Sequence, residues 1–166
     1  MIVQTVTTVR TMTATIYFGE MVFALIFAIF LLATSAFSMG EAIVLFSGGV
    51  VALTLGEYTV HRFLLHHIAT TQHRIHHAHP DKAIDQIFWQ IWVCFAVVYL
   101  ITGGVVLAGA LTAYAWYLFI HYCAHHNPDI LPSSLLRHHS DHHSFAHRNY
   151  GVTTTIWDHV FRTMLR

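Results

Sequence analysis

The chain has 166 residues, of which 55% are hydrophobic and only 10% are charged. Ordinary soluble domains carry roughly 25% charged residues, so this composition excludes a disordered chain and disfavours a soluble globule. The eight Lys and Arg side chains balance the eight Asp and Glu side chains, which leaves no basic field to hold nucleic acid as a partner.

Long apolar stretches indicate helices that cross a membrane. Residues 21–40 carry no charge, and about 20 such residues are what a helix needs to cross a hydrocarbon core. After Glu41, residues 42–56 are again apolar. Residues 86–120 as one helix would overshoot a bilayer of roughly 30 Å, so we expect a fold-back at Gly103-Gly104. The prediction is an all-α integral membrane protein with four transmembrane helices in two hairpins, near 18–39, 42–60, 86–101 and 104–122.

Glycines in and between these spans are expected to permit close helix contacts. They are Gly48, Gly49, Gly56, Gly103, Gly104 and Gly109. The whole chain, 1–166, is predicted to form a single membrane-embedded domain with a histidine-rich helical cap made of residues 61–85 and 121–166.

The cationic side chains set the expected orientation. All eight lie on one side of the predicted spans: Arg10, Arg62, Arg74, Lys82, Arg137, Arg148, Arg162 and Arg166. Cytoplasmic loops carry an excess of Lys and Arg, so we expect both termini and the histidines to face the cytoplasm, from an inner or plasma membrane. A cleaved signal peptide is an alternative interpretation of the first span, because small residues lie at 33–36.

Sixteen histidines outnumber the lysines and arginines together, and ten of them follow a repeated plan. After each predicted hairpin comes a histidine pair and then an H-x-x-H-H sequence. The first half supplies His61, His66, His73, His76 and His77, and the second half supplies His121, His125, His139, His142 and His143. Residues at i, i+3 and i+4 share one helix face, so each H-x-x-H-H should aim three imidazoles one way. His61 and His66 differ by about 140° on a regular helix, so that pair needs a distorted turn or serves different ions.

Imidazole suits Zn, Cu, Fe or Ni, and ten converging imidazoles exceed the coordination of one ion, so we expect two metal ions. Asp141 and Asp158 are the first candidates to orient these imidazoles through hydrogen bonds. The other histidines are expected to be interfacial or supporting residues: His67, His79, His126, His138, His147 and His159. The predicted spans lack histidines before His121, which disfavours haem, and the H-E-x-x-H sequence of a zinc hydrolase is absent. A redox-active metal pair beside a bilayer instead indicates activation of dioxygen and attack on a lipid C–H bond.

The order of the histidine sequences carries a resemblance to a known family. H-x4-H, H-x2-H-H, H-x3-H and H-x2-H-H are followed by N-Y-G at 149–151 and by T-x-x-W-D-x-x-F-R-T at 154–163. Over residues 61–163 this pattern resembles the fatty acid hydroxylase/sterol desaturase superfamily. The resemblance implies a non-haem di-iron membrane oxygenase that uses O2 and external electrons to hydroxylate or desaturate a lipid, such as a fatty acyl chain or a sterol-like lipid. It implies that the ten histidines of the repeated plan are the iron ligands, and zinc is a common substitute at such sites.

Two other interpretations stay open. Bacterial carotenoid hydroxylases are similar in length, span layout and histidine boxes, although the W-D-x-x-F ending is not typical of them. A non-catalytic metal-binding or metal-transport membrane protein is the interpretation from another class, but transport usually places ionisable ligands within the spans. Since the sequence shows no fused cytochrome b5 domain, the resemblance implies a separate electron donor of the ferredoxin or cytochrome type.

Overall fold

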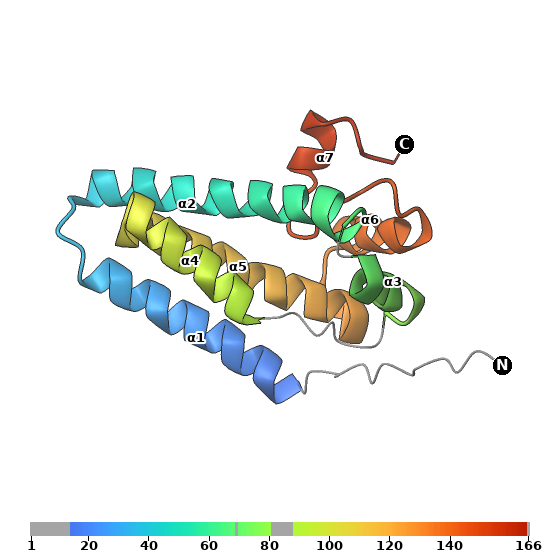
Figure 1. The fold of residues 1–166 in the computed structure, drawn as a ribbon, viewed down its shortest axis with the longest axis horizontal. Coiled ribbons are helices and arrows are strands. Elements are labelled where there is room, and N and C mark those ends of the chain that lie inside the picture. The colour runs from blue at the N-terminus through green and yellow to red at the C-terminus, as the bar shows by residue number, and fades with distance from the viewer. Residues whose placement is uncertain (1–13, 69, 81–87, 166) are drawn as a thin grey trace.

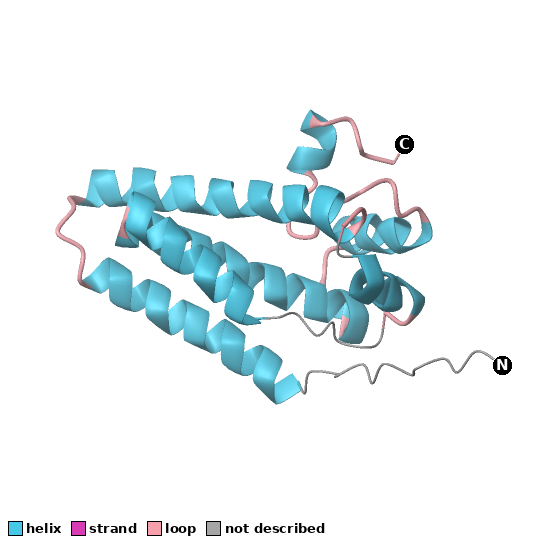
Figure 2. Cartoon of the chain, in the orientation of Figure 1, coloured by secondary structure: helices cyan, strands magenta, loops and turns pink. Residues whose placement is uncertain are grey.

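The structure is a computed structural model that describes residues 14–68, 70–80 and 88–165, and these residues are helical or in loops (Figures 1 and 2). Among the described residues, four longer helices lie lengthwise in a bundle: α1 (Ala14–Ala33), α2 (Met39–Thr59), α4 (Phe88–Thr102) and α5 (Gly104–His126). Shorter helices follow α2 and α5: the π-helix η1 (Val60–Leu65), α3 (Thr70–Ala78), the 3-10 helix η2 (Pro128–Ile130), α6 (Ser133–Ser144) and α7 (Ile156–Val160). The all-α prediction is confirmed for the described residues.

Within the described part of the chain, three helical segments are long and apolar enough to cross a membrane: Thr15–Ala33, Met39–Leu65 and Gly104–His126. They correspond to the first, second and fourth predicted spans. The helix α4 has 15 residues, or about 22 Å, which is shorter than a hydrocarbon core of about 30 Å. A span near 86–101 therefore stays a prediction, and residues 86 and 87 lie outside the described part. The cytoplasmic orientation also stays a prediction, with Arg10, Lys82 and Arg166 outside the described residues.

The first hairpin turns earlier than the charge pattern predicts. The helix α2 begins at Met39, so the turn lies at 34–38 and Glu41 is inside the helix. The Ser38 hydroxyl accepts a hydrogen bond from the Glu41 amide at 3.4 Å, and the Glu41 carboxylate accepts one from the Ser38 amide at 2.9 Å. In this capping box the carboxylate also faces the positive end of the helix dipole. Glu41 therefore lies in the first turn of the second helix, whereas the charge pattern predicted a break between two spans at this residue.

The helix α5 lies at the centre and contacts α1, α2 and α4. Its backbone and that of α2 approach closely at two glycines, because a Cβ on Gly49 would overlap the Val106 carbonyl oxygen and a Cβ on Gly109 would overlap that of Phe46. The expected close helix contacts are thus found at these two positions. Gly104 lies against Leu31, whereas a Cβ on Gly48, Gly56 or Gly103 would meet nothing within 4 Å. Gly103 instead provides the predicted fold-back, with a φ of 86° that favours glycine.

Candidate metal centre

The ten histidines of the repeated plan meet at one end of the bundle, where α3 and α6 lie beyond the ends of α2 and α5 (Figure 1). His61 lies in η1 and His66 directly follows it. His121 and His125 lie in the last turns of α5, and the two H-x-x-H-H sequences lie in α3 and α6. The turn between α1 and α2 is at the opposite end. The bundle therefore brings both halves of the sequence pattern to one place.

The imidazoles form two groups whose potential ligand atoms lie within 4.8 Å of one another. Group A consists of His61, His66, His73, His77 and His142, and group B consists of His76, His125, His139 and His143. His121 adjoins group B, because its Nε2 lies 3.2 Å from Nε2 of His76.

Each H-x-x-H-H sequence is divided between the two groups. On a helix, position i+4 lies about 40° from i on one side and i+3 about 60° on the other. In α3, His73 and His77 therefore join group A while His76 joins group B. In α6 the assignment is reversed, since His142 joins group A and its neighbours join group B. Each half of the chain thus supplies one histidine to the group of the other half.

The turn between His61 and His66 is distorted, as one of the two sequence interpretations requires. Residues 60–65 form a π-helix, whose wider turns close hydrogen bonds from i to i+5. The Nε2 atoms of His61 and His66 both lie 3.0 Å from Nε2 of His73. The pair consequently belongs to one group.

The arrangement of ring nitrogens in group A fits a bound cation. Nε2 of His73 lies within 3.1 Å of the Nε2 atoms of His61, His66 and His77. A neutral imidazole has a single N–H, so His73 can donate to at most one of these three neighbours, and the remaining lone pairs would face one another. A metal ion accepts all of these lone pairs, and an all-imidazole set suits Fe, Zn, Cu or Ni.

Burial also keeps these imidazoles in the deprotonated form that binds metals. It lowers the pKa of His66 to about 4 and the pKa of His73 and His76 to about 2, with neighbouring imidazoles adding to the effect. Burial lowers the pKa of His142 and His143 to about 3. Neutral imidazole is the ligand form, so the folded protein presents ligands without first having to release protons near pH 7.

Two backbone carbonyls determine which nitrogen of His61 and His142 faces group A. The His61 Nδ1–H donates to the Tyr150 carbonyl at 2.5 Å, and the His142 Nδ1–H donates to the Arg148 carbonyl at 2.7 Å. The Nε2 lone pair of each ring is therefore directed into the group. Such hydrogen bonds behind a ligand fix the ring orientation at metal sites.

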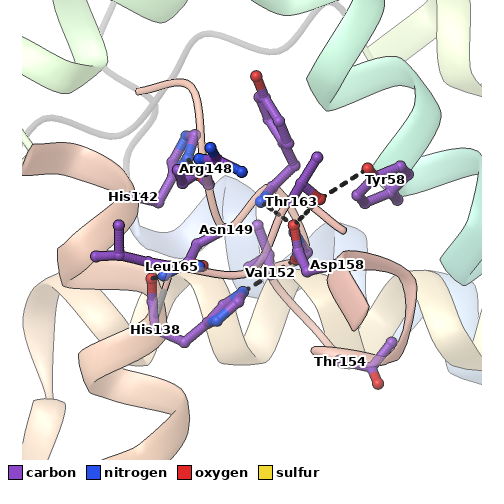
Figure 3. Close-up of polar contacts among 12 residues, drawn as sticks. Tyr58, His138, His142, Arg148, Asn149, Val152, Thr154, Asp158, Thr163 and Leu165 are labelled. Atoms are coloured by element: carbon purple, nitrogen blue, oxygen red, sulfur yellow. Dashed lines mark hydrogen bonds and ion pairs between the residues drawn. The ribbon is translucent and has the colours of Figure 1, made fainter. Parts of the chain in front are cut away.

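Asp158 organises the closing segment, defined here as residues 145–165, that carries these two carbonyls (Figure 3). Its carboxylate is fully buried and accepts hydrogen bonds from the amides of Tyr150 and Gly151 and from the Thr163 hydroxyl, at 2.9, 2.8 and 2.6 Å. It also lies 3.1 Å from Nε2 of His138. Burial alone would raise the pKa of Asp158, but the hydrogen bonds from His138, Thr163 and the two amides outweigh burial and lower it.

The second predicted supporting carboxylate, Asp141, is placed differently. It lies 3.7 Å from Arg137, one helical turn away along α6. Around the axis of α6, Asp141 lies about 100° from His142. The structure therefore gives Asp141 a surface ion pair.

Two residues near the site take roles that spacing alone does not predict: His138, expected only as an interfacial or supporting residue, and Glu57. His138 is buried and contacts Asp158, whereas His67, His79, His126, His147 and His159 are exposed as expected. The position of His138 beside an H-x-x-H-H sequence gave no spacing signal. Glu57 accepts hydrogen bonds from the Val152 and Thr153 amides at 2.6 and 3.1 Å and so ties α2 to the closing segment. An acidic residue inside an apolar stretch is a signal that could have found it.

Comparisons with known proteins show what this chain is similar to. The model of the fatty acid hydroxylase family matches residues 46–163. The dihydroceramide fatty acyl 2-hydroxylase FAH2 of Arabidopsis thaliana is 32% identical over 70% of this chain and 58% of its own length. The ceramide very long chain fatty acid hydroxylase scs7 of Schizosaccharomyces pombe is 34% identical over 81% of this chain and 46% of its own. The chain thus spans about half the length of these relatives.

A solved structure is also similar in fold. It is titled full length scs7p, with only the hydroxylase domain visible, and it has a TM-score of 0.68 and 28% sequence identity to this chain. The match covers 92% of this chain and 63% of the other.

Proposed function

Because the chain belongs to the fatty acid hydroxylase family, we propose that it is a membrane-bound non-haem di-iron oxygenase that hydroxylates a lipid acyl chain. The reaction converts a C–H bond, O2, two electrons and two protons into C–OH and water. The observation that carries the proposal is the pair of imidazole groups at the ends of two candidate spans.

The residues that would hold the two ions follow from the two groups. Group A would bind one ion, and group B together with His121 would bind the other. When bound, the iron pair supplies the activation of dioxygen that attack on a C–H bond requires. The protein contributes neutral ligands, ring orientation through the carbonyls of residues 148 and 150, and a buried environment that limits access of water.

The lipid substrate is proposed to reach the site from the bilayer. Large apolar side chains beside His61 are exposed, including Phe63, Leu64 and Ile68, and exposed apolar surface at the end of a span fits contact with lipid. The names of the relatives refer to fatty acyl chains and ceramides, which favours an acyl chain over a carotenoid. The electrons are proposed to come from a separate ferredoxin or cytochrome.

Iron content tests the proposal directly. After expression in iron-supplemented cells, we expect two irons per chain by elemental analysis, a coupled pair by Mössbauer spectroscopy, and hydroxylated lipids in the membranes. Absence of iron under these conditions, with a single zinc or a haem band instead, would favour the non-catalytic metal-binding alternative.

Two substitutions test the two histidines, one from each half, that join the group of the other half. His76→Ala and His142→Ala should each remove metal and abolish oxygenation together, because each deletes one ligand of a group. The exposed His67 provides the control, and His67→Ala should keep both iron and product. Full activity in either of the first two variants would refute the ligand assignment.

A further inference from the structure

The two groups differ in how the protein holds their imidazoles. In group A, the Nδ1–H groups of His61 and His142 donate to backbone carbonyls. In group B, the Nδ1 atoms of His76, His139 and His143 are buried and have no hydrogen-bond partner among the described residues, and the same holds for Nδ1 of His73 in group A. Two rings of group A therefore have an orientation fixed by a backbone carbonyl, which these three rings of group B lack.

The carbonyl that holds His61 is itself held by Asp158. A trans peptide is planar, and its C=O and N–H point in opposite directions. The Tyr150 carbonyl and the Gly151 N–H belong to the same peptide. The Gly151 N–H donates to Asp158 at 2.8 Å, so this hydrogen bond aims the carbonyl on the other side of the peptide at His61.

The carbonyl that holds His142 is controlled in the same way, through Thr163. The Arg148 carbonyl shares its peptide with the Asn149 N–H, which donates to the Thr163 carbonyl at 3.0 Å. Thr163 in turn donates its hydroxyl to the Asp158 carboxylate and its amide to the Asp158 carbonyl, at 2.6 and 2.8 Å. Asp158 is thus the common anchor of both peptides (Figure 3).

We propose that Asp158 is a positioning residue for group A, which it preorganises through these two peptides, and that group A consequently binds its metal ion more tightly than group B. The inference rests on the proposed function only in taking the two groups as metal sites. It assigns to the closing segment a role in metal affinity, exerted without contact between Asp158 and the ion.

The test is a titration of the metal-free protein with Zn²⁺ against a chromophoric chelator. Wild type should bind two Zn²⁺ in two steps, and His142→Ala should lose the tighter step whereas His139→Ala should lose the weaker one. Asp158→Asn should weaken the tighter step by about 10- to 100-fold, the range found for residues that support metal ligands, and leave the weaker step unchanged. Equal weakening of both steps, or a tighter step that survives in His142→Ala, would overturn the proposal.

Two further variants separate positioning from loss of the fold. Thr163→Val keeps the carboxylate but removes one hydrogen bond to it, and should weaken the tighter step by about fivefold. Asp129 is exposed in η2, so Asp129→Asn should leave both steps unchanged. In ¹⁵N spectra of the zinc-loaded protein, the Nδ1–H signals of His61 and His142 should broaden or shift in Asp158→Asn. Unchanged signals would contradict a positioning role.

This experiment is independent of the oxygenase proposal, because its readout is zinc affinity. Two zinc steps with the expected response to Asp158→Asn in a protein that never oxygenates lipid would support the positioning role and refute the oxygenase. If the protein oxygenates lipid but both zinc steps weaken equally in Asp158→Asn, the oxygenase proposal would be supported and the positioning role refuted.

Discussion

Gly151 shows how little room a single position in the closing segment has. A Cβ there would overlap the Thr154 carbonyl oxygen and lie 3.0 Å from Oδ2 of Asp158. A methyl group would therefore displace the backbone or the carboxylate that orients the peptides behind group A. Gly151→Ala should lower the stability of the protein by about 1–3 kcal/mol, as overpacking commonly does, measured by thermal unfolding in detergent.

Gly56 provides the matched control for this substitution. It lies inside α2, and a Cβ there would meet nothing within 4 Å. Since alanine is the better helix former by about 0.5–1 kcal/mol, Gly56→Ala should leave the unfolding temperature unchanged or raise it slightly. A Gly151→Ala protein as stable as wild type would show that the closing segment can shift without cost.

At the scale of helices, the close contact of α2 with α5 determines where the histidines meet. His61 directly extends α2, and His121 and His125 lie on α5. The two backbones can approach because Gly49 and Gly109 lie at their interface. Because glycine has no side chain to separate the two backbones, α2 and α5 pack closely, and their histidine-bearing ends lie side by side.

Separating these helices should affect stability and metal binding together. In Gly109→Ala the new methyl group would overlap the Phe46 carbonyl oxygen, so α2 and α5 must move apart. We expect a loss of about 1–3 kcal/mol in stability and a reduced iron content per chain. Gly48 is the control, since a Cβ there meets nothing; equal loss of iron in Gly48→Ala would mean that helix propensity, not helix contact, is responsible.

At the scale of the whole molecule, each half of the chain contributes one imidazole ring to the histidine group that the other half mainly forms. His76 reaches group B from the first half, and His142 reaches group A from the second. Neither group is complete within one half. Metal binding should therefore couple the two hairpins, and the metal-free protein should be markedly less stable than the loaded one.

The stability of the metal-free protein should depend on pH in a defined direction. Burial lowers the pKa of His66 to about 4 and of His142 and His143 to about 3, whereas an unfolded histidine titrates near 6.5. Between about pH 6.5 and pH 4 the unfolded chain binds more protons than the folded chain, so stability falls as the pH falls through this window. Above about pH 7 these rings are neutral in both states and should contribute no pH dependence.

Unfolding temperatures of chelator-treated protein in detergent, measured from pH 8 to pH 5, check this prediction. The unfolding temperature should be constant above pH 7 and decrease below pH 6.5. A flat profile down to pH 5 would mean that the histidines are accessible and titrate normally in the folded state. The same series on metal-loaded protein should decline at lower pH, because bound metal competes with protons for the rings.

The sequence by itself determined the helical class, the apolar segments and the ten histidines that gather at one end. Periodicity and spacing report residues on one helix face, and hydrophobic length reports membrane spans, so these features are local and can be read along the chain. The resemblance of residues 61–163 to a family is likewise a property of order and spacing. For His61 and His66, which cannot share a face of a regular helix, the spacing left two interpretations open, a distorted turn or different ions, and the π-helix corresponds to the first.

Only the tertiary structure decided how the histidines divide, which carboxylate is buried within the closing segment and where the backbones touch. Asp141 and Asp158 were equal candidates in the sequence, but burial and four polar contacts single out Asp158. Likewise, six glycines looked alike, and Gly49 and Gly109 alone lie where a Cβ would overlap the facing helix. These outcomes depend on contacts between residues up to about a hundred positions apart, such as Tyr58 with Thr163. Spacing along one chain carries no information about such contacts until the helices are packed together.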